Sequence, residues 1–266
     1  MRVLVTGGTG VLGTHVVALL RNRGDEVRVL SRRPGVVGAV AGDLVSGEGL
    51  AEACEGMDAV AHLASAVAAP REWDGVDVGG TRLLGQAACR AGVSHMVLVS
   101  ILGVDHIPMG YYRAKLAAEH ALASSGVPWT VLRLAQFHEL VDAMLRLLAK
   151  APVVPVPRGV SVQPIAAADA ARVVVDALDA GPRYGIIGAG GPQTLTVKEA
   201  AEQWLAARRE AGGRGGAVVQ VPVPGPVIAG FRAGHNLMPA SSQPGIPFGD
   251  WSRERLSRHT PPAYRL

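Results

Sequence analysis

The stretch MRVLVTGGTGVLG, residues Met1–Gly13, decides the fold. Its apolar run Val3–Val5 is typical of a short buried strand, the glycines end that strand, and a helical pattern opens at Val11. A glycine-rich turn between a strand and a helix N-terminus points backbone N–H groups and the positive end of the helix dipole at an anion. The stretch therefore predicts a site for the diphosphate of a dinucleotide.

The three glycines have separate expected roles. Gly7 makes the tight turn, Gly10 lets the backbone approach a pyrophosphate, and Gly13 packs the helix against the strand. An ordinary strand–turn–helix is the alternative, but the strand before and the helix after favour dinucleotide binding. The residues expected to contact the cofactor here are Gly7, Thr9, Gly10, Val11 and Leu12.

Composition limits the classes of function. The chain has 266 residues, which predicts one large domain or one domain with a small extension. Its net charge is +4, and only three of its 26 basic residues are lysines. The arginines are scattered among acidic residues, which argues against a nucleic-acid-binding stripe. The mild positive excess suits a phosphorylated cofactor.

The cysteines and the apolar runs exclude several further classes. Cys54 and Cys89 stand singly in helical patterns, so we expect neither a metal site nor a disulfide framework. No apolar run reaches the ~18–20 residues of a membrane span, and the first strand begins at the first residues, which leaves no room for a signal peptide. We expect a cytoplasmic protein that does not bind membranes, and leave open whether it is a monomer or a homodimer.

Strands and helices alternate along residues 1–150, the expected dinucleotide-binding core. This pattern predicts an α/β fold with a Rossmann-like, doubly wound parallel sheet whose strand ends share one edge. After the first strand, the expected strands are Glu26–Leu30, Val36–Gly42, Ala59–Leu63, His95–Ile101 and Trp129–Leu134. The expected helices are Thr14–Arg23, Leu50–Cys54, Val76–Ala91 and Tyr111–Ser125.

Residues 151–266 are expected to form a smaller C-terminal lobe that completes the substrate pocket within a single structural unit. Ala151–Gly159 contains three prolines, so it predicts a loop or edge segment rather than a helix. Thr196 and Glu199 have the spacing of a capping box at a helix start. The expected helices are Ala166–Ala180, Thr196–Arg209, Val227–Leu237 and Asp250–Arg258, with a short strand in Tyr184–Gly191.

The end of the second strand indicates the cofactor. Ser31, Arg32 and Arg33 stand where a site that prefers NAD has an acidic residue for the ribose 2′-hydroxyl. Arginines suit a 2′-phosphate through charge-assisted, forked hydrogen bonds. We therefore predict NADP(H), with Arg32 mattering more than Arg33; the alternative is a loop of solvated arginines.

Two more strand ends are expected to line the cofactor. Asp43 and Leu44 follow the third strand, where the carboxylate either reaches the adenine amino group or makes a turn. Leu63, Ala64 and Ser65 follow the fourth strand, and their small side chains let a ribose approach closely. His62, just before them, is interpreted as a packed strand residue rather than a catalyst.

Tyr111 and Lys115 are four positions apart on an expected helix and so share one face. The ammonium group lowers the pKa of the phenol and bonds a cofactor ribose, and the phenol donates a proton to a carbonyl oxygen as hydride arrives. Ser100, at the end of the fifth strand, is the candidate to hold that oxygen. Tyr112 points about 100° away on a helix, and an ordinary amphipathic helix is the alternative.

Four motifs together resemble the short-chain dehydrogenase/reductase superfamily: Thr6–Gly13, Gly42-Asp43-Leu44, Leu63-Ala64-Ser65 and Tyr111-x-x-x-Lys115. The chain is more closely similar to the atypical, NmrA-like branch of NAD(P)-binding proteins, over about residues 1–210. The resemblance implies a Rossmann-like fold, use of NADP(H), and catalysis by Ser, Tyr and Lys in the active members.

The serine pattern departs from that resemblance. A further hydroxyl is usual one to three residues after the serine, and here Ile101, Leu102 and Gly103 follow Ser100. Either Ser100 itself serves or the contact to the carbonyl oxygen is missing. Some NmrA-like members sense the cofactor without turnover, so a regulatory protein is the alternative to an oxidoreductase.

Gln136 and His138 follow the sixth strand and are candidates to orient a substrate beside the nicotinamide. His138 has a second interpretation, as a cap or a partner of Glu139. The segments expected on the far side, Pro155–Gln163 and Phe231–Met238, are mostly apolar and suit a hydrophobic carbonyl, enone or quinone.

Overall fold

The computed structural model describes residues 1–32, 38–67, 69–238 and 244–264, and the chain divides into two compact units. The first unit consists of Met1–Asp105, Met109–Arg133 and Ala170–Gly188. The second consists of His106–Pro108, Leu134–Asp169 and Ala189–Leu266. This division differs from a boundary at residue 150, because most of one later helix and one later strand join the first unit.

A sheet of seven strands organises the first unit, in the order β3-β2-β1-β4-β5-β6-β9. The pairings β2–β3, β1–β2, β1–β4 and β4–β5 are parallel. The reversal of strand order beside β1 is the doubly wound arrangement that the alternating sequence predicts. The strands are β1 Arg2–Thr6, β2 Glu26–Ser31, β3 Ala39–Ala41, β4 Ala59–His62, β5 His95–Ile101, β6 Trp129–Leu134 and β9 Ile186–Ala189.

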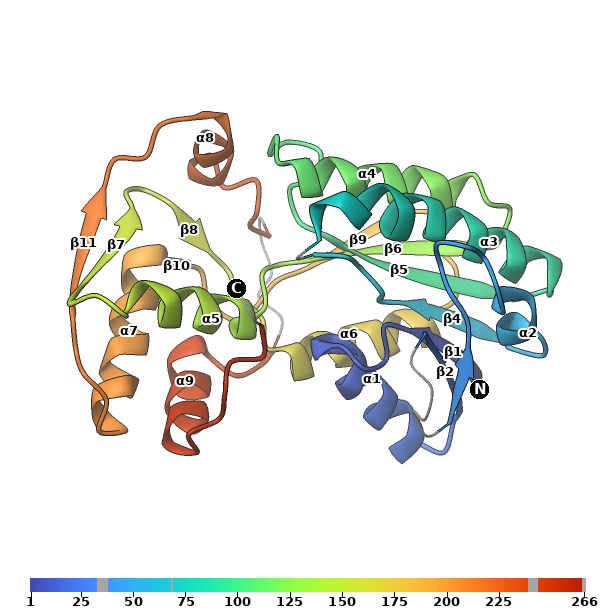
Figure 1. Ribbon diagram of the computed structural model, residues 1–266, viewed down its shortest axis with the longest axis horizontal. Coiled ribbons are helices and arrows are strands. Elements are labelled where there is room, and N and C mark those ends of the chain that lie inside the picture. Colours follow the sequence, from blue (N-terminus) through green and yellow to red (C-terminus); the bar gives the residue numbers. More distant parts are fainter. Residues whose placement is uncertain (33–37, 68, 239–243, 265–266) are drawn as a thin grey trace. The chain divides into compact units, whose positions relative to one another are not determined.

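Helices cover both faces of this sheet (Figure 1): α3 and α4 lie on one face and α1 and α6 on the other. The helices are α1 Val11–Asn22, α2 Leu50–Cys54, α3 Gly80–Arg90, α4 Gly110–Ala123 and α6 Ala167–Asp179. Leu4, Leu84 and Leu122 belong to one apolar cluster and are fully buried between sheet and helices. Because both faces are covered, the central strands are continuous apolar runs rather than alternating ones.

The segment before α3 departs from the expected long helix Val76–Ala91. Residues Trp73–Gly79 form a π-helical segment, and regular α-helix begins only at Gly80. A Cβ on Gly80 would lie 2.8 Å from the Cβ of Leu44, so this glycine lets the helix start lie close to its neighbour. π-helical turns are rare in proteins, and many of those that occur lie at functional sites.

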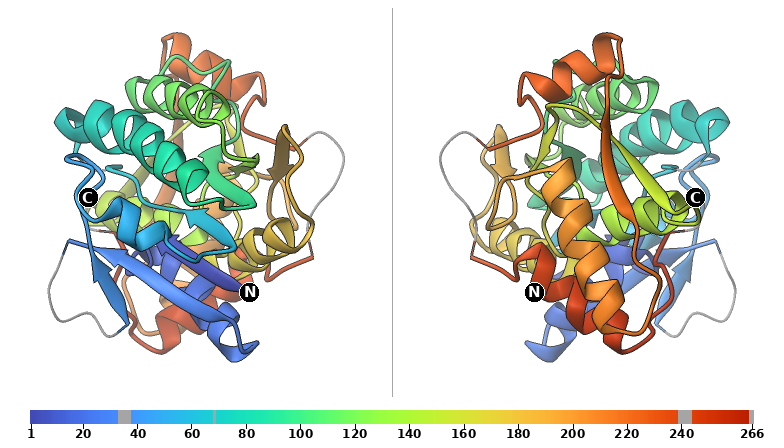
Figure 2. Two further views of the ribbon diagram at one scale, coloured as in Figure 1. Left: turned by 90° about the vertical axis from the view of Figure 1, so that its right-hand side faces the viewer. Right: turned by 90° about the vertical axis from the view of Figure 1, so that its left-hand side faces the viewer.

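The second unit has two small sheets and four helices among its described residues. Strands β7 (Val153–Pro157) and β11 (Ala217–Val221) pair in parallel, and β8 (Ser161–Val162) pairs antiparallel with β10 (Leu195–Thr196). The helices are α5 His138–Leu148, α7 Val197–Glu210, α8 Pro226–Arg232 and α9 Phe248–Ser257. Figure 2 shows α7 beside α9, where Trp204 and Phe248 belong to the core of this unit.

Several local predictions for the second half are confirmed. The proline-rich segment is extended and pairs with β11. Thr196 caps α7, with its hydroxyl accepting from the Glu199 amide and the Glu199 carboxylate accepting from the Thr196 amide.

Helix α8 ends at Arg232, earlier than the expected Leu237. The expectation for Val36–Gly42 falls partly outside the described residues, and β3 covers only Ala39–Ala41.

Candidate functional site

The glycine loop between β1 and α1 is built for close approach of backbone to backbone. Gly7 has φ +68°, and a Cβ there would lie 2.6 Å from the Ala64 nitrogen. A Cβ on Gly13 would lie 2.1 Å from the Gly7 carbonyl oxygen, so only glycine allows α1 to start this near the loop. The amide of Gly10 donates to the same Gly7 oxygen at 2.9 Å and closes the turn.

The start of α1 fits an anionic ligand. Its N-cap is Gly10, which has no side chain to bond the amides of the first turn, and that turn contains no acidic residue. Those amides and the helix dipole are the donors that hold a phosphate in dinucleotide sites. Thr9 and Gly10 are exposed, and Val11 is half-buried, so the loop is accessible within this unit. The residues present therefore fit the diphosphate of a nicotinamide dinucleotide.

The other expected cofactor residues lie at the same end of the strands. Ser31 ends β2 and Arg32 follows it with an exposed side chain, whereas Arg33 lies outside the described residues. The Asp43 carboxylate accepts from the Val45 amide at 3.0 Å, which is the turn-forming alternative, and Leu44 is buried in the core. The contact of Asp43 with an adenine stays a prediction.

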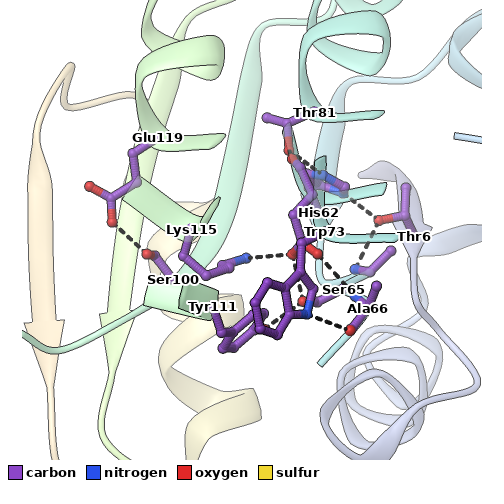
Figure 3. A network of polar contacts seen from close by, with 12 residues as sticks. Thr6, His62, Ser65, Ala66, Trp73, Thr81, Ser100, Tyr111, Lys115 and Glu119 are labelled. Carbon is purple, nitrogen blue, oxygen red and sulfur yellow. Dashed lines mark hydrogen bonds and ion pairs between the residues drawn. The ribbon is translucent and has the colours of Figure 1, made fainter. Parts of the chain in front are cut away.

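Tyr111 and Lys115 lie on one face of α4, as their spacing predicts. Tyr111 is half-buried, and its hydroxyl lies 2.5 Å from the Ser65 hydroxyl oxygen at the end of β4 (Figure 3). Lys115 is 3% exposed, and burial lowers the pKa of its ammonium group, although the charges of Asp77 and Glu119 oppose the shift. The phenol and the ammonium thus share a site with Ser65.

Asp77 stands at the centre of this site. Its carboxylate is buried and accepts from the Ser65 hydroxyl at 2.6 Å and from the Ala66 amide at 3.1 Å. The Lys115 Nζ lies 3.6 Å from the same oxygen that accepts from Ser65. Asp77 belongs to the π-helical segment, so the irregular backbone before α3 carries the acid that pairs with Lys115.

A line of buried hydrogen bonds holds the backbone of Asp77. The Thr81 hydroxyl donates to the Asp77 carbonyl at 2.5 Å, so its oxygen accepts from His62 Nε2 at 2.9 Å. The other ring nitrogen, Nδ1, then accepts from the Thr6 hydroxyl at 2.6 Å. Burial, followed by the charge of Lys115, lowers the pKa of His62 to about 3. His62 is a neutral structural residue, which confirms the prediction from sequence.

Trp73 packs over the phenol. Its indole lies 5.5 Å from the Tyr111 ring, centre to centre, and its N–H donates to the Ala66 carbonyl at 3.0 Å. A Cβ on Gly110 would lie 2.9 Å from the indole, so this glycine leaves room for the ring at the start of α4. The indole therefore restricts the orientation of Tyr111 from the side of the π-helical segment.

Ser100 is bonded within the protein, and its expected role of holding a substrate oxygen stays a prediction. Its buried hydroxyl donates to a carboxylate oxygen of Glu119, one helical turn beyond Lys115 (Figure 3). Arg133 holds both oxygens of that carboxylate, at 3.0 and 2.8 Å, and also reaches Asp105 at 2.7 Å. The hydroxyl that the structure brings to Tyr111 is that of Ser65, whereas the strand-end Ser100 is engaged in this ion-pair network.

Gln136 and His138 belong to the second unit. His138 is fully buried, its Nε2 donates to the Ile246 carbonyl at 2.9 Å, and burial lowers its pKa to about 4. The neighbouring Glu139 carboxylate instead accepts from the Ala167 amide. The bond to Ile246 is the packing contact of His138, and its role toward a substrate stays a prediction, as does that of half-buried Gln136.

Sequence reasoning missed Asp77, Trp73 and Glu119. Glu119 carries a usable signal, since it follows Lys115 by four positions on the same helix face. Asp77 carries little, because a π-helical segment does not follow the 3.6-residue period on which side-chain positions are inferred.

The described part of the chain has neither a cluster of metal-ligating side chains nor a membrane-spanning helix. No group of three or more His, Cys, Asp or Glu side chains in it is placed to hold a metal ion. None of its helices has the length and apolar character needed to cross a bilayer.

Comparisons with known proteins agree with this geometry. A family model described as NAD(P)H-binding matches residues 7–181, from the glycine loop to the end of α6. Sterol demethylase protein B of Methylococcus capsulatus is 35% identical over 149 residues, which are 45% of this chain and 45% of that protein. The chain thus spans less than half the length of that relative.

Two further relatives extend over nearly the whole chain. The (4-alkanoyl-5-oxo-2,5-dihydrofuran-3-yl)methyl phosphate reductase of Streptomyces griseus is 28% identical over an alignment of 298 residues, covering 97% of this chain and 99% of that protein. The UDP-glucose 4-epimerase of Thermus thermophilus, solved in complex with NAD, is 25% identical with a TM-score of 0.70, covering 96% of this chain and 98% of that chain. The matched family model, which covers residues 7–181, establishes that the chain belongs to the NAD(P)H-binding family.

Proposed function

We propose that the protein is an NADP(H)-dependent oxidoreductase that reduces a carbonyl, enone or quinone-like small molecule. The observation that carries the proposal is the meeting of Tyr111, Lys115 and Ser65 at the carboxyl end of the sheet. In open α/β sheets, ligands bind at this edge, and a phenol beside a buried ammonium is a general acid. The Streptomyces griseus relative is itself a reductase, which supports this direction of the reaction.

The chemistry assigned to each group follows from its place. When bound, the reduced nicotinamide supplies a hydride. Tyr111 donates its phenolic proton to the substrate oxygen, because its hydroxyl is the accessible acid of the site. Lys115 stabilises the phenolate through its positive charge and bonds the cofactor ribose, and the Gly7–Gly13 loop holds the diphosphate.

A substrate screen tests the proposal. The protein is incubated with NADPH and panels of quinones, enones and ketones, and oxidation of NADPH is followed by absorbance. We expect turnover with at least one apolar member of the panels. Tight NADP(H) binding with no oxidation by any compound would contradict the enzymatic proposal.

The catalytic role of Tyr111 has its own test. Tyr111→Phe removes the acidic proton and keeps the ring against Trp73, so turnover should fall by at least ~10²-fold, the scale of a general-acid contribution. Cofactor affinity measured by calorimetry should stay nearly unchanged. Tyr112→Phe, which alters the adjacent buried tyrosine, is the matched control and should keep its turnover. Unchanged turnover in Tyr111→Phe would remove this residue from the mechanism.

One observation favours a second candidate function, a non-catalytic, NmrA-like protein that senses NAD(P) and binds a regulatory partner. The hydroxyl of Ser100 donates to Glu119, so the strand-end serine is engaged away from the phenol. A sensor would bind NADP(H) tightly and fail the whole substrate screen, whereas the enzyme would pass it. The position of Tyr111 and Lys115 on one face of α4 supports the enzyme.

A further inference from the structure

A continuous line of polar contacts joins the phenol to the ammonium without passing through a cofactor. The Tyr111 and Ser65 hydroxyl oxygens are 2.5 Å apart, Ser65 donates to Asp77 at 2.6 Å, and Lys115 lies 3.6 Å from the same Asp77 oxygen. Figure 3 shows Ser65, at the end of β4, close to Tyr111 and Lys115 on α4, and Asp77 joins them from the π-helical segment. Each neighbouring pair is near enough for a proton to pass after a small side-chain movement.

The hydrogen atoms give this line a direction. A serine hydroxyl has one hydrogen, and Ser65 donates it to the Asp77 carboxylate. The phenol of Tyr111 must then be the donor in its bond to the Ser65 oxygen. Asp77 accepts from both ends, since the Lys115 ammonium points at the oxygen that Ser65 bonds. The line is therefore ordered from Tyr111 through Ser65 to Asp77, with Lys115 as the proton donor at the far end.

The burial of the inner members distinguishes this line from a surface network. The side chain of Asp77 is 0% exposed and that of Lys115 4% exposed, whereas Ser65 and Tyr111 reach the accessible side of the site. The buried anion of this pair, Asp77, is carried by π-helical backbone whose carbonyl accepts from Thr81, and Thr81 in turn accepts from His62, whereas the buried cation, Lys115, lies on α4. Charges that are this deeply desolvated are costly unless they are paired, and such groups gather at functional sites.

We propose that Ser65 and Asp77 form a proton relay that returns the proton of Tyr111 from Lys115 after each turnover. This inference rests on the proposed function. It assigns to Ser65 a role beyond the cofactor contact expected of it, and to Asp77 a role that no motif in the sequence indicates.

Reduction of a carbonyl begins with transfer of a hydride to carbon and of a proton from Tyr111 to oxygen. The carbon accepts the hydride with its electron pair, and the Tyr111 O–H bond breaks as the substrate O–H bond forms. The phenolate takes the hydrogen of Ser65, Ser65 takes a proton through Asp77, and Asp77 takes it from Lys115 Nζ. The neutral amine of Lys115 then takes up one proton from the solvent, so each reduction consumes one solvent proton. Oxidation of an alcohol runs the same transfers in reverse.

Three variants separate a relay from a purely structural network. Ser65→Ala breaks the line while leaving Asp77 and Lys115 in place, and Ser65→Thr keeps a hydroxyl. Asp77→Asn keeps the side-chain volume and an acceptor for Ser65 but removes the charge. Ser94→Ala is the matched control, since that hydroxyl bonds the Asp58 carbonyl at another site in the same unit.

The first measurement needs no substrate. Ultraviolet difference titration of each variant against the same variant carrying Tyr111→Phe isolates the phenol of Tyr111 from the other tyrosines. The titration is made with NADP⁺ present. Asp77→Asn removes one of the two carboxylates, Asp77 and Glu119, that offset the charge of Lys115, so the pKa of Tyr111 should fall by about one unit, the lower range for a nearby charge. An unchanged pKa in Asp77→Asn overturns the relay, even if the protein proves not to be an enzyme.

The second measurement uses any substrate found in the screen. When wild-type turnover is measured in mixtures of H₂O and D₂O and plotted against the deuterium fraction, the plot should be curved, because several protons move together. Ser65→Ala should lower turnover by about 10²-fold and make the dependence linear, while Ser65→Thr restores both. Wild-type turnover and curvature in Ser65→Ala overturn the relay but leave the oxidoreductase proposal intact. Failure of the substrate screen, in contrast, counts against the proposed function alone.

Discussion

Arg32 is the residue on which the choice between NADP and NAD is expected to depend. It follows β2 directly and its side chain is exposed, so a guanidinium is available at the strand end where the adenine ribose is expected. A hydrogen bond to a charged group contributes about 1.5–3 kcal/mol. We predict that Arg32→Ala weakens NADPH binding by about 10- to 100-fold and leaves NADH binding unchanged.

Calorimetry with both cofactors checks this prediction. Arg82→Ala, which removes an exposed arginine on α3 of the same unit, is the control for a general loss of positive charge. Equal affinity of the wild type for NADPH and NADH would contradict the assigned role of Arg32.

The site residues differ in how far sequence could place them. Tyr111 and Lys115 were predictable as a pair because helical spacing alone puts them on one face. The partner of Ser100 was not, because strand-end position says nothing about which way a buried hydroxyl is turned. That choice is made by Glu119 and Arg133, which offer Ser100 a charged acceptor within α4 and β6. Ser65 was expected beside the cofactor for its size, and its bond to the phenol depends on a tertiary contact between β4 and α4.

At the scale of elements, the start of α1 depends on Gly13. A Cβ there would lie 2.1 Å from the Gly7 carbonyl oxygen and 2.7 Å from Gly8 Cα, both backbone atoms. An added methyl group therefore forces the helix away from the loop and moves the amides that face the diphosphate. We predict that Gly13→Ala lowers the free energy of unfolding by about 1–3 kcal/mol and weakens cofactor binding by more than ~10-fold, as expected for displaced donors.

Gly185→Ala is the matched control for this change. It stands beside β9 in the same unit, and its added Cβ would meet only the Arg183 carbonyl oxygen at 3.6 Å. Its stability should stay within about 0.5 kcal/mol of the wild type, measured by urea unfolding alongside calorimetry with NADPH. Full cofactor affinity in Gly13→Ala would show that the loop does not position the ligand.

The elements that sequence predicted well are those with a regular period and clear ends. Helix α2 and strands β5 and β6 match their expected bounds, because apolar periodicity and flanking turn residues mark them. The π-helical segment Trp73–Gly79 was in part predicted to be ordinary helix, since its extra residue per turn leaves no signature in apolar spacing. Helix α5 lies outside the expected elements although its apolar residues recur with a helical period, and its start at Phe137 carries no capping side chain to mark it.

At the scale of the whole molecule, the division into two units does not follow the order of the chain. Helix α6 and strand β9 lie late in the sequence, yet most of α6 and of β9 belongs to the first unit. The change to proline-rich sequence after Lys150 falls inside the second unit, whose segment Leu134–Asp169 begins before it and includes α5, and only sheet pairing returns β9 to the first unit. Sequence composition therefore indicates that a second unit exists, but it fixes neither where that unit begins nor where the chain returns to the first.

Both units contain buried histidines, and these should make the whole molecule sensitive to acid. Burial lowers the pKa of His62 to about 3 and of His138 to about 4, and lowers the pKa of His95 as well. Below their ordinary pKa of 6.5, the unfolded chain binds protons that the folded chain excludes. Each such histidine therefore removes about 1.4 kcal/mol of folding stability per pH unit as the pH falls from 6.5 toward its folded pKa. Glu139 opposes this in part, because burial raises its pKa and its folded form takes up a proton first.

We predict that the free energy of unfolding, measured with urea at pH 7, 6 and 5, falls as the pH falls. In His62→Gln, the slope of the unfolding free energy against pH should decrease by about 1.4 kcal/mol per unit. The folded and unfolded states then no longer differ by the proton that the unfolded chain binds at His62. His95→Gln should show the same decrease at an independent buried site. His15→Gln, which changes an exposed side chain of α1, should leave the slope unchanged. A histidine that is neutral when folded and protonated when unfolded must make the free energy of unfolding depend on pH. If His62→Gln and His95→Gln both keep the wild-type slope, the acid sensitivity therefore arises from other residues.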